Sequence, residues 1–227
     1  MTTDFSKVKV VLLDVDNTLL DFQAAQRQAI RGTLTYFGAP SDEETVARFD
    51  ALNKSYWRAF ERGEISMEKL VVERFSVFFE REGIAGDAEE AERAYRKNLA
   101  DNHDLIPGAM DALLYLKEKY AVYLVTNGRE GSQRKRLTDS GILSNVDGAF
   151  ISESIGYRKP QKEFFSYVFA HIPPVKKEET VVIGDSLSGD IAGGKNYGLP
   201  TIWFNRRNKE GTADVEIRDW REIYEIL

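Results

Sequence analysis

The sequence contains no cysteine, and this absence excludes several kinds of chemistry. Disulfides, thiol nucleophiles, iron–sulfur clusters and cysteine-bound zinc all need a thiol. Histidine is nearly absent as well: the chain has only 2, His103 and His171, and neither has a neighbour that suggests catalysis. No site can therefore hold a metal on three histidines. Any metal that the chain binds must rest mainly on oxygen ligands.

An excess of positive charge and long apolar runs are also missing. The 31 Lys and Arg residues face 37 Asp and Glu residues, which gives a formal net charge of −6, whereas proteins that bind a nucleic-acid backbone are generally basic. No apolar run approaches the roughly 18 residues that span a bilayer, and the opening MTTDFSKVKV lacks a signal-peptide core. We expect a cytoplasmic monomer or weak homodimer that binds neither nucleic-acid polymers nor membranes.

Five short apolar runs predict buried strands, at 8–13, 121–125, 148–151, 180–183 and 200–204. Helical patterns separate the later runs, at 110–119, 134–140, 164–171 and 190–197. Strands that alternate with helices indicate a parallel sheet with right-handed crossovers. The predicted fold class is therefore α/β, with a Rossmann-like parallel sheet flanked by helices.

The segment 21–101 has no strand-like run and predicts a four-helix insertion, with helices near 22–37, 42–61, 66–82 and 87–100. Ser41 and Ser66 stand at plausible N-cap positions. We expect a core domain made of 1–20 and 102–227, and a helical cap domain made of 21–101. An insertion just after a strand would overhang the edge where open α/β sheets bind ligands, so we interpret it as a lid.

The first polar cluster follows the strand at 8–13 and reads Asp14-Val15-Asp16-Asn17-Thr18. Alternate residues of an extended segment point the same way, so Asp14 and Asp16 would present two carboxylates together. Taken alone, the segment fits an ordinary turn equally well, because Asp, Asn and Thr are common where strands end.

Two further segments follow later strands. Thr126-Asn127-Gly128 offers a hydroxyl and a sharp turn with backbone N–H groups, which suits an oxyanion. Lys159 precedes Pro160, so its backbone is extended and its ammonium can be held near the sheet edge. Each segment also has an ordinary interpretation, as a turn and as a solvated lysine.

The fourth segment follows the strand at 180–183 and places Asp185 at the strand end and Asp190 in the first helical turn. Helix capping would explain this segment by itself. All four segments, however, lie at the carboxyl ends of predicted parallel strands or in the loops that follow, and this shared position favours one site.

These segments resemble, in order, the four motifs of the haloacid dehalogenase-like hydrolase superfamily. The motifs correspond to Asp14-Val15-Asp16-Asn17-Thr18, Thr126-Asn127-Gly128, Lys159-Pro160, and Gly184-Asp185 with Asp190. The resemblance covers almost the whole chain, because the helical insertion is similar to the superfamily's type-one cap. One departure is Lys162, which stands where family members often carry a second proline.

A narrower resemblance points to the pyrimidine 5′-nucleotidase subgroup. It rests on Asn53-Lys54-Ser55-Tyr56-Trp57, Gly63-Glu64-Ile65-Ser66, Gly193-Gly194 and Trp203-Phe204-Asn205. Substrate choice is expected to come from the lid: Phe22 follows the first motif closely, and Asn53, Tyr56 and Trp57 lie on the second predicted lid helix, with aromatic faces and an amide for a nucleobase. The alternative is that Tyr56 and Trp57 only pack the lid. Arg206 and Arg207 lie in a hydrophilic turn, where we expect them to be solvated.

The resemblance implies a Mg²⁺-dependent phosphomonoesterase. Asp14 would be the nucleophile and form an aspartyl-phosphate, and Asp16 would act as acid and base. Mg²⁺ would rest on Asp14, Asp185 and the backbone carbonyl of Asp16. Supporting contacts would come from Thr18 and Asp190, and phosphate would be bound by Thr126, Asn127 and Lys159.

The implied substrate is a small phosphate ester, in the first place a nucleoside 5′-monophosphate with a pyrimidine or non-canonical base. A phosphatase of small sugar or organic-acid phosphates such as phosphoglycolate shares every catalytic residue. A non-catalytic phosphate-binding or receiver-like module is a third alternative. Dehalogenases of the superfamily carry no acid two residues after the nucleophile, because a halide leaves without a proton, so Asp16 favours a phosphatase.

Overall fold

The computed structural model describes residues 5–227 of the chain, which form two compact units. One unit comprises residues 5–21 and 103–227 and contains the sheet. The other, Phe22–Asn102, is helical. The chain therefore leaves the first unit shortly after its first strand and returns to it before the second.

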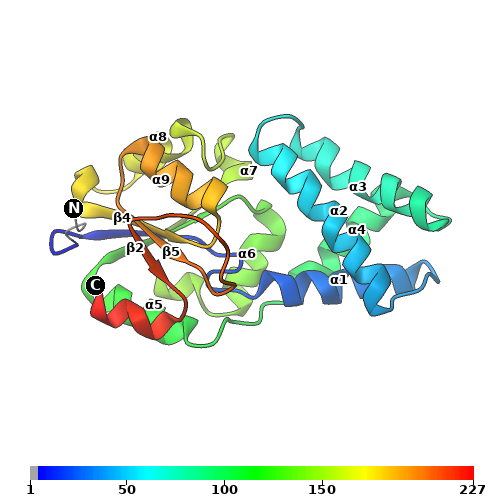
Figure 1. Ribbon diagram of the computed structural model, residues 1–227, viewed down its shortest axis with the longest axis horizontal. Helices are drawn as coiled ribbons and strands as arrows, with labels where there is room; N and C mark the ends of the chain where they lie inside the picture. Colours follow the sequence, from blue (N-terminus) through cyan, green and yellow to red (C-terminus); the bar gives the residue numbers. More distant parts are fainter. Residues whose placement is uncertain (1–4) are drawn as a thin grey trace. The chain divides into compact units, whose positions relative to one another are not determined.

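The sheet has six parallel strands (Figure 1). In chain order these are β1 (Val10–Leu13), β2 (Ala121–Thr126), β3 (Gly148–Ile151), β4 (Thr180–Gly184), β5 (Thr201–Phe204) and β6 (Val215–Ile217). Their order across the sheet is β3-β2-β1-β4-β5-β6, so β1 lies between β2 and β4. The prediction of an α/β parallel sheet is confirmed.

The predicted strands differ from the structure at several of their ends, and one strand was not predicted. β1 begins at Val10, because Val8 closes a turn in which its N–H donates to the Phe5 carbonyl. The sequence analysis missed β6, which has 3 residues and carries Glu216 at its centre. A strand that short has no apolar run to reveal it.

Helices cover both faces of the sheet (Figure 1). The α-helices of this unit are α5 (Ala109–Lys119), α6 (Glu130–Asp139), α7 (Ser152–Ile155), α8 (Lys162–His171) and α9 (Ala192–Tyr197). Three predicted helices begin earlier than expected: α5 at Ala109, α6 at Glu130 instead of 134, and α8 at Lys162. The last predicted helix is divided into a π-helical turn at Leu187–Ile191 and α9, which begins at Ala192.

Alternate residues of β1 enter two different apolar clusters. Val11 and Leu13 pack in the cluster that includes Leu113 of α5, whereas Leu12 packs in the cluster that includes Phe164 of α8. All four residues of β1 are buried, which explains its continuous apolar sequence. The sheet is thus the middle of three layers, and polar side chains can collect only at its edges and ends.

The helical unit contains α1 (Phe22–Tyr36), α2 (Glu43–Glu61), α3 (Met67–Glu82) and α4 (Ala88–Ala100). The expected N-cap at Ser66 is present, since its side chain accepts from the Lys69 N–H. The expected cap at Ser41 is wrong: Asp42 is the N-cap of α2 and accepts from the Thr45 N–H at 2.9 Å. An aspartate also complements the positive end of the helix dipole, which a serine does not.

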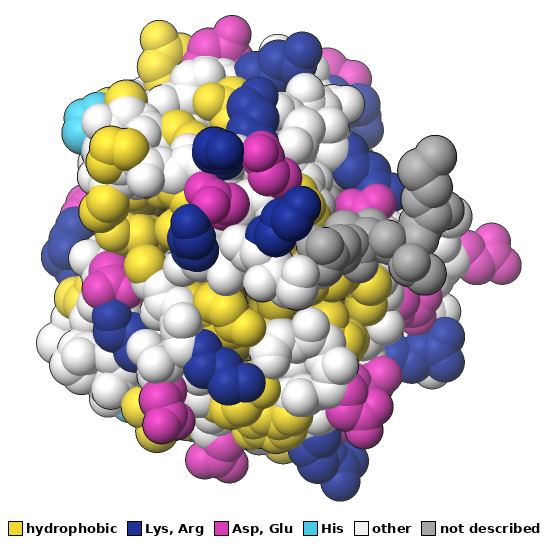
Figure 2. Space-filling view, turned by 90° about the vertical axis from the view of Figure 1, so that its left-hand side faces the viewer, with side chains coloured by type: hydrophobic (Ala, Val, Ile, Leu, Met, Phe, Trp, Pro, Cys, Tyr) yellow, Lys and Arg dark blue, Asp and Glu magenta, His cyan; other side chains and the backbone are white. Residues whose placement is uncertain are grey.

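The surface of the sheet-containing unit carries mixed charge on the face seen in Figure 2, where basic and acidic side chains are interspersed with apolar ones. Among residues 5–227, no helix combines the length and the apolar character that a membrane crossing requires.

Candidate active site

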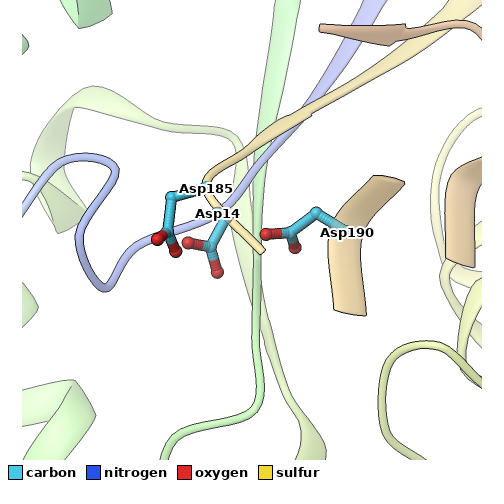
Figure 3. Close-up of side chains that lie close together, drawn as sticks. All are labelled: Asp14, Asp185 and Asp190. Atoms are coloured by element: carbon cyan, nitrogen blue, oxygen red, sulfur yellow. The ribbon is translucent and has the colours of Figure 1, made fainter. Parts of the chain in front are cut away.

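Three aspartates meet at the carboxyl edge of the sheet (Figure 3). Asp14 follows β1, Asp185 follows β4, and Asp190 lies in the π-helical turn. Because β1 and β4 are neighbours, the chain brings together segments that are far apart in sequence. One carboxylate oxygen from each aspartate lies within 4.8 Å of the other two.

The ammonium of Lys159 lies among these carboxylates and is 3% exposed. Its Nζ donates to Asp14 Oδ1 at 2.7 Å, to Asp190 Oδ1 at 2.6 Å and to the Val125 carbonyl at 2.7 Å. All three ammonium hydrogens therefore have acceptors within the protein. Burial opposes the charge, but attraction to Asp14 and Asp190 outweighs it and raises the pKa of Lys159.

The two ammonium groups that contact the cluster, those of Lys159 and Lys209, do not balance its three carboxylates. Burial, followed by repulsion from Asp190, raises the pKa of Asp14 to about 7 against the attraction of Lys159. Burial also raises the pKa of Asp185 and of Asp190. The cluster thus carries excess negative charge in a site that contains only oxygen donors. This donor set fits a hard divalent cation such as Mg²⁺.

The residues around the aspartates fix their orientation. Thr18 donates from Oγ1 to Asp14 Oδ2 at 2.8 Å, and the Ser186 N–H donates to Asp190 Oδ2 at 3.0 Å. Asp190 packs directly on Gly184, where an added Cβ would overlap its carboxylate. Glycine is therefore required at that position. The indole of Trp203 donates to the Asp185 carbonyl at 3.0 Å.

Asn127 contacts the segment that carries Lys159. Its side chain forms a reciprocal pair with the backbone of Lys159, donating from Nδ2 to the carbonyl at 2.8 Å and accepting from the N–H at 2.9 Å. The amide thus holds the lysine segment in place. Nδ2 carries a second hydrogen, so this pair is compatible with a phosphate contact through the Asn127 side chain, and the hydroxyl of Thr126 lies at the end of β2.

Asp16 does not join the other aspartates. Arg136 Nη1 donates to its Oδ1 at 2.6 Å, and Gln133 Nε2 donates to its Oδ2 at 3.0 Å. The sequence analysis missed both donors, because it began the helix at 134 and judged it by its polar composition. The signal was present: in a helix that begins at Glu130, Gln133 and Arg136 share the buried face with Leu137.

A basic loop after β5 lies beside the aspartates. Lys209 donates to Asp185 Oδ2 at 3.1 Å, Arg207 donates to Asn17 Oδ1 at 3.0 Å, and Arg206 forms an ion pair with Asp21 at 3.2 Å. Both arginines are exposed, as expected, and each also has a polar partner. A shallow pocket is lined by Asn17, Asp185, Phe204, Asn205, Arg206, Arg207 and Lys209.

The helical unit buries one of the residues expected to contact the substrate. Asn53 is 1% exposed, accepts from Arg74 Nη1 at 2.6 Å and donates to Gln26 Oε1 at 2.6 Å. The amide oxygen and the amide nitrogen of Asn53 therefore both have partners inside the helical unit. Arg74 in turn pairs with the buried Glu92.

The two aromatic candidates lie at different places in the helical unit. Phe22 is the first residue of α1 and is partly buried. Trp57 packs edge-on against Phe60, with 5.7 Å between the ring centroids, and its buried indole N–H has no hydrogen-bond partner among residues 5–227. Tyr56 joins the same apolar cluster. This packing favours the alternative that Tyr56 and Trp57 stabilise the helical unit.

Known proteins match this chain over most or nearly all of its length. A sequence model described as haloacid dehalogenase-like hydrolase matches residues 8–198. The HAD-hydrolase YfnB of Bacillus subtilis is 40% identical over 97% of this chain and 96% of its own. Its magnesium-bound crystal structure has a TM-score of 0.92 and 39% identity, covering 96% of this chain and 98% of that one.

Two relatives carry a more specific name. The pyrimidine 5′-nucleotidase PynA of Streptococcus pneumoniae is 36% identical over 96% of this chain and 94% of its own. The pyrimidine 5′-nucleotidase YjjG of Escherichia coli is 28% identical over 88% of this chain and 87% of its own.

Proposed function

The chain belongs to the haloacid dehalogenase-like hydrolase family, and on this basis we propose that it is a Mg²⁺-dependent phosphomonoesterase with Asp14 as the nucleophile. The observation that carries the proposal is the position of Asp14. Its carboxylate lies at the carboxyl end of the central strand, held by Lys159 and Thr18, beside two further aspartates. The magnesium-bound structure of YfnB supports the same choice of metal.

Asp14 and Asp185, with the backbone carbonyl of Asp16, would hold the metal. Mg²⁺ supplies positive charge that offsets the repulsion between a carboxylate and a phosphate ester. Lys159 keeps Asp14 oriented, because its ammonium is itself fixed by Asp190 and the Val125 carbonyl. Asp190 thus acts on the nucleophile through Lys159.

The reaction proceeds in two steps. An oxygen of Asp14 attacks phosphorus, the ester P–O bond breaks, and the leaving alkoxide takes a proton from Asp16. Water then attacks the phosphorus of the aspartyl-phosphate, gives a proton to Asp16 and restores the Asp14 carboxylate. Thr126 and the N–H groups of the following turn donate to the non-bridging phosphate oxygens, which carry most of the transition-state charge.

A nucleoside 5′-monophosphate is the substrate class that we propose, supported by the names of PynA and YjjG. We assign the helical unit, Phe22–Asn102, as the lid that selects the substrate. Its two connections pair with each other next to the first motif, where the Asp21 N–H donates to the Asp104 carbonyl at 2.9 Å. Phe22 follows this pairing directly, which keeps it as a candidate for substrate contact.

A substrate screen tests this function. Nucleoside 5′-monophosphates with pyrimidine, purine and modified bases are compared with phosphoglycolate, sugar phosphates and 4-nitrophenyl phosphate, each with Mg²⁺ and with EDTA. We expect Mg²⁺-dependent release of phosphate, highest with pyrimidine or modified nucleotides and abolished by EDTA. Preference for phosphoglycolate or a sugar phosphate would overturn the nucleotide assignment, whereas the proposed phosphatase activity would stand. Failure to hydrolyse any ester would overturn the phosphatase proposal and favour the non-catalytic phosphate-binding module.

The pH dependence of activity follows from the raised pKa of Asp14. Because that pKa is about 7 without metal, Asp14 is largely protonated below that pH and cannot attack phosphorus. Mg²⁺ competes with this proton. We therefore expect the acidic limb of the kcat/KM profile to move to lower pH as the Mg²⁺ concentration rises, by about one pH unit for each tenfold increase above the dissociation constant of Mg²⁺ for the deprotonated site. An acidic limb that is independent of Mg²⁺ would contradict this account.

A further inference from the structure

α6 buries two polar side chains that the mechanism above does not use. Gln133 is 2% exposed and Arg136 is 1% exposed, and their spacing of three residues places them on one face of the helix. Burial of an amide and a guanidinium is unfavourable unless hydrogen bonds compensate for the lost water. The hydrogen bonds of these two side chains therefore indicate why α6 buries them.

Their hydrogen bonds connect two of the proposed active-site residues. Gln133 Nε2 donates to Asp16 Oδ2 and to Thr126 Oγ1, each at 3.0 Å. Arg136 Nη1 donates to Asp16 Oδ1 at 2.6 Å and to Gln133 Oε1 at 3.1 Å. One network thus joins the proposed acid, Asp16 in the first motif, to the hydroxyl of Thr126 in the second motif.

The network fixes the direction in which Thr126 donates. Its Oγ1 accepts from Gln133 Nε2 at 3.0 Å and from the Gly128 N–H at 3.1 Å. A hydroxyl oxygen has two lone pairs, so these donors occupy its acceptor capacity. The hydroxyl hydrogen is then directed away from both nitrogens. Thr126 is prepared to donate, as a phosphate oxygen requires.

The same network restrains Asp16, whose side chain is 22% exposed and could otherwise sample several rotamers. Each of its carboxylate oxygens meets a donor from a nearly buried side chain. A general acid works only within hydrogen-bond reach of the atom that it protonates, so loss of orientation lowers the rate of that proton transfer.

We propose that Gln133 and Arg136 are positioning residues, which hold Asp16 for proton transfer to the leaving oxygen and keep Thr126 a donor to phosphate. The inference rests on the proposed function, because it requires Asp16 to be the acid. It assigns a role to two residues of α6 that lie outside the four motifs.

Two aryl esters of similar shape separate this role from a purely structural one. The departure of phenol from phenyl phosphate needs a proton, whereas 4-nitrophenolate leaves readily without one. The parameter to compare is kcat/KM, because it covers the steps up to leaving-group departure and excludes hydrolysis of the aspartyl-phosphate. We expect Arg136→Met to lower kcat/KM for phenyl phosphate by about tenfold or more beyond its effect on 4-nitrophenyl phosphate.

Matched variants sharpen the test. Arg136→Lys, which keeps the charge, is expected to recover most of the loss. Arg134→Met removes an exposed arginine of the same helix, paired with Glu130, and is expected to leave both esters unchanged. Gln133→Glu turns a donor toward Thr126 into an acceptor and is expected to raise the inhibition constant of orthophosphate at least about fivefold, whereas Gln133→Met raises it less.

The outcomes are distinguishable. Equal losses on the two esters, or an unchanged or raised kcat/KM for phenyl phosphate, would overturn the role of Arg136. An unchanged orthophosphate inhibition constant in Gln133→Glu would overturn the orientation of Thr126. If Arg136→Met fails to fold by circular dichroism, Arg136→Lys and the Gln133 variants decide. No Mg²⁺-dependent turnover of either ester by the wild-type chain would instead overturn the proposed function, and this inference with it.

Discussion

Asp14→Asn is expected to lower kcat/KM for the best substrate by about 10⁴-fold or more, because it removes the attacking oxygen from the proposed mechanism. The side-chain amide has nearly the same shape as the carboxylate, and its oxygen can still accept from Lys159 or Thr18. The change therefore tests chemistry more than packing. Phosphate release is measured with Mg²⁺, and a high concentration of the variant enzyme makes a loss of this size detectable.

The direction in which Asp14→Asn changes the stability of the metal-free protein can also be predicted. Burial raises the pKa of Asp14 from 3.8 to about 7, so its ionisation in the folded state is unfavourable and destabilises the metal-free protein increasingly between those pH values. Without metal at pH 8, Asp14→Asn should be at least as resistant to thermal unfolding as the wild type. Retained activity, or a markedly lower melting temperature, would contradict the assignment of Asp14.

Lys159→Met is expected to reduce both activity and stability. It leaves Asp14 and Asp190 buried together without the ammonium that touches both. Loss of one partner from a buried ion pair lowers the free energy of unfolding by about 3–5 kcal/mol. Activity should fall by about 10³-fold, because the nucleophile loses the contact that orients it. Urea unfolding without metal, together with kcat/KM, measures the two effects.

The pH dependence of the Lys159→Met loss provides a control. Attraction to the two carboxylates raises the pKa of Lys159, so its stabilising contribution is present at neutral pH and disappears only at strongly alkaline pH. The loss should shrink as the pH falls below about 7, where Asp14 takes up a proton. Lys162→Met, at an exposed lysine of the following helix, should change neither quantity. A pH-independent loss would indicate a packing defect.

Much of the fold could be predicted because it depends on local patterns. Buried parallel strands have continuous apolar runs, and the carboxyl ends of such strands meet at one edge of the sheet. This reasoning placed Asp14, Thr126 and Asp185 at that edge without knowledge of any contact. The three-residue strand β6 has no such run, and the sequence analysis therefore missed it.

The hydrogen-bond network of the site could not be predicted in the same way. Asn127 pairs with the backbone of a segment 32 residues away, and Arg136 pairs with Asp16 across 120 residues. Asn53 was predicted to contact the substrate, and its burial against Arg74 and Gln26 inside the helical unit was not foreseen. A polar side chain faces inward when other elements supply its hydrogen-bond partners. The spacing of apolar residues does not reveal those partners.

The most direct measurement asks whether the phosphoryl group is transferred to Asp14. Asp16→Asn lacks the proposed base for hydrolysis of the aspartyl-phosphate, so it should accumulate this species. Incubation with Mg²⁺ and 4-nitrophenyl phosphate, acid quenching and peptide mapping by mass spectrometry should locate one phosphoryl group on Asp14, and none in the Asp14→Asn/Asp16→Asn double variant. A phosphoryl group on another residue, or rapid turnover of the ester by the double variant, would contradict the account.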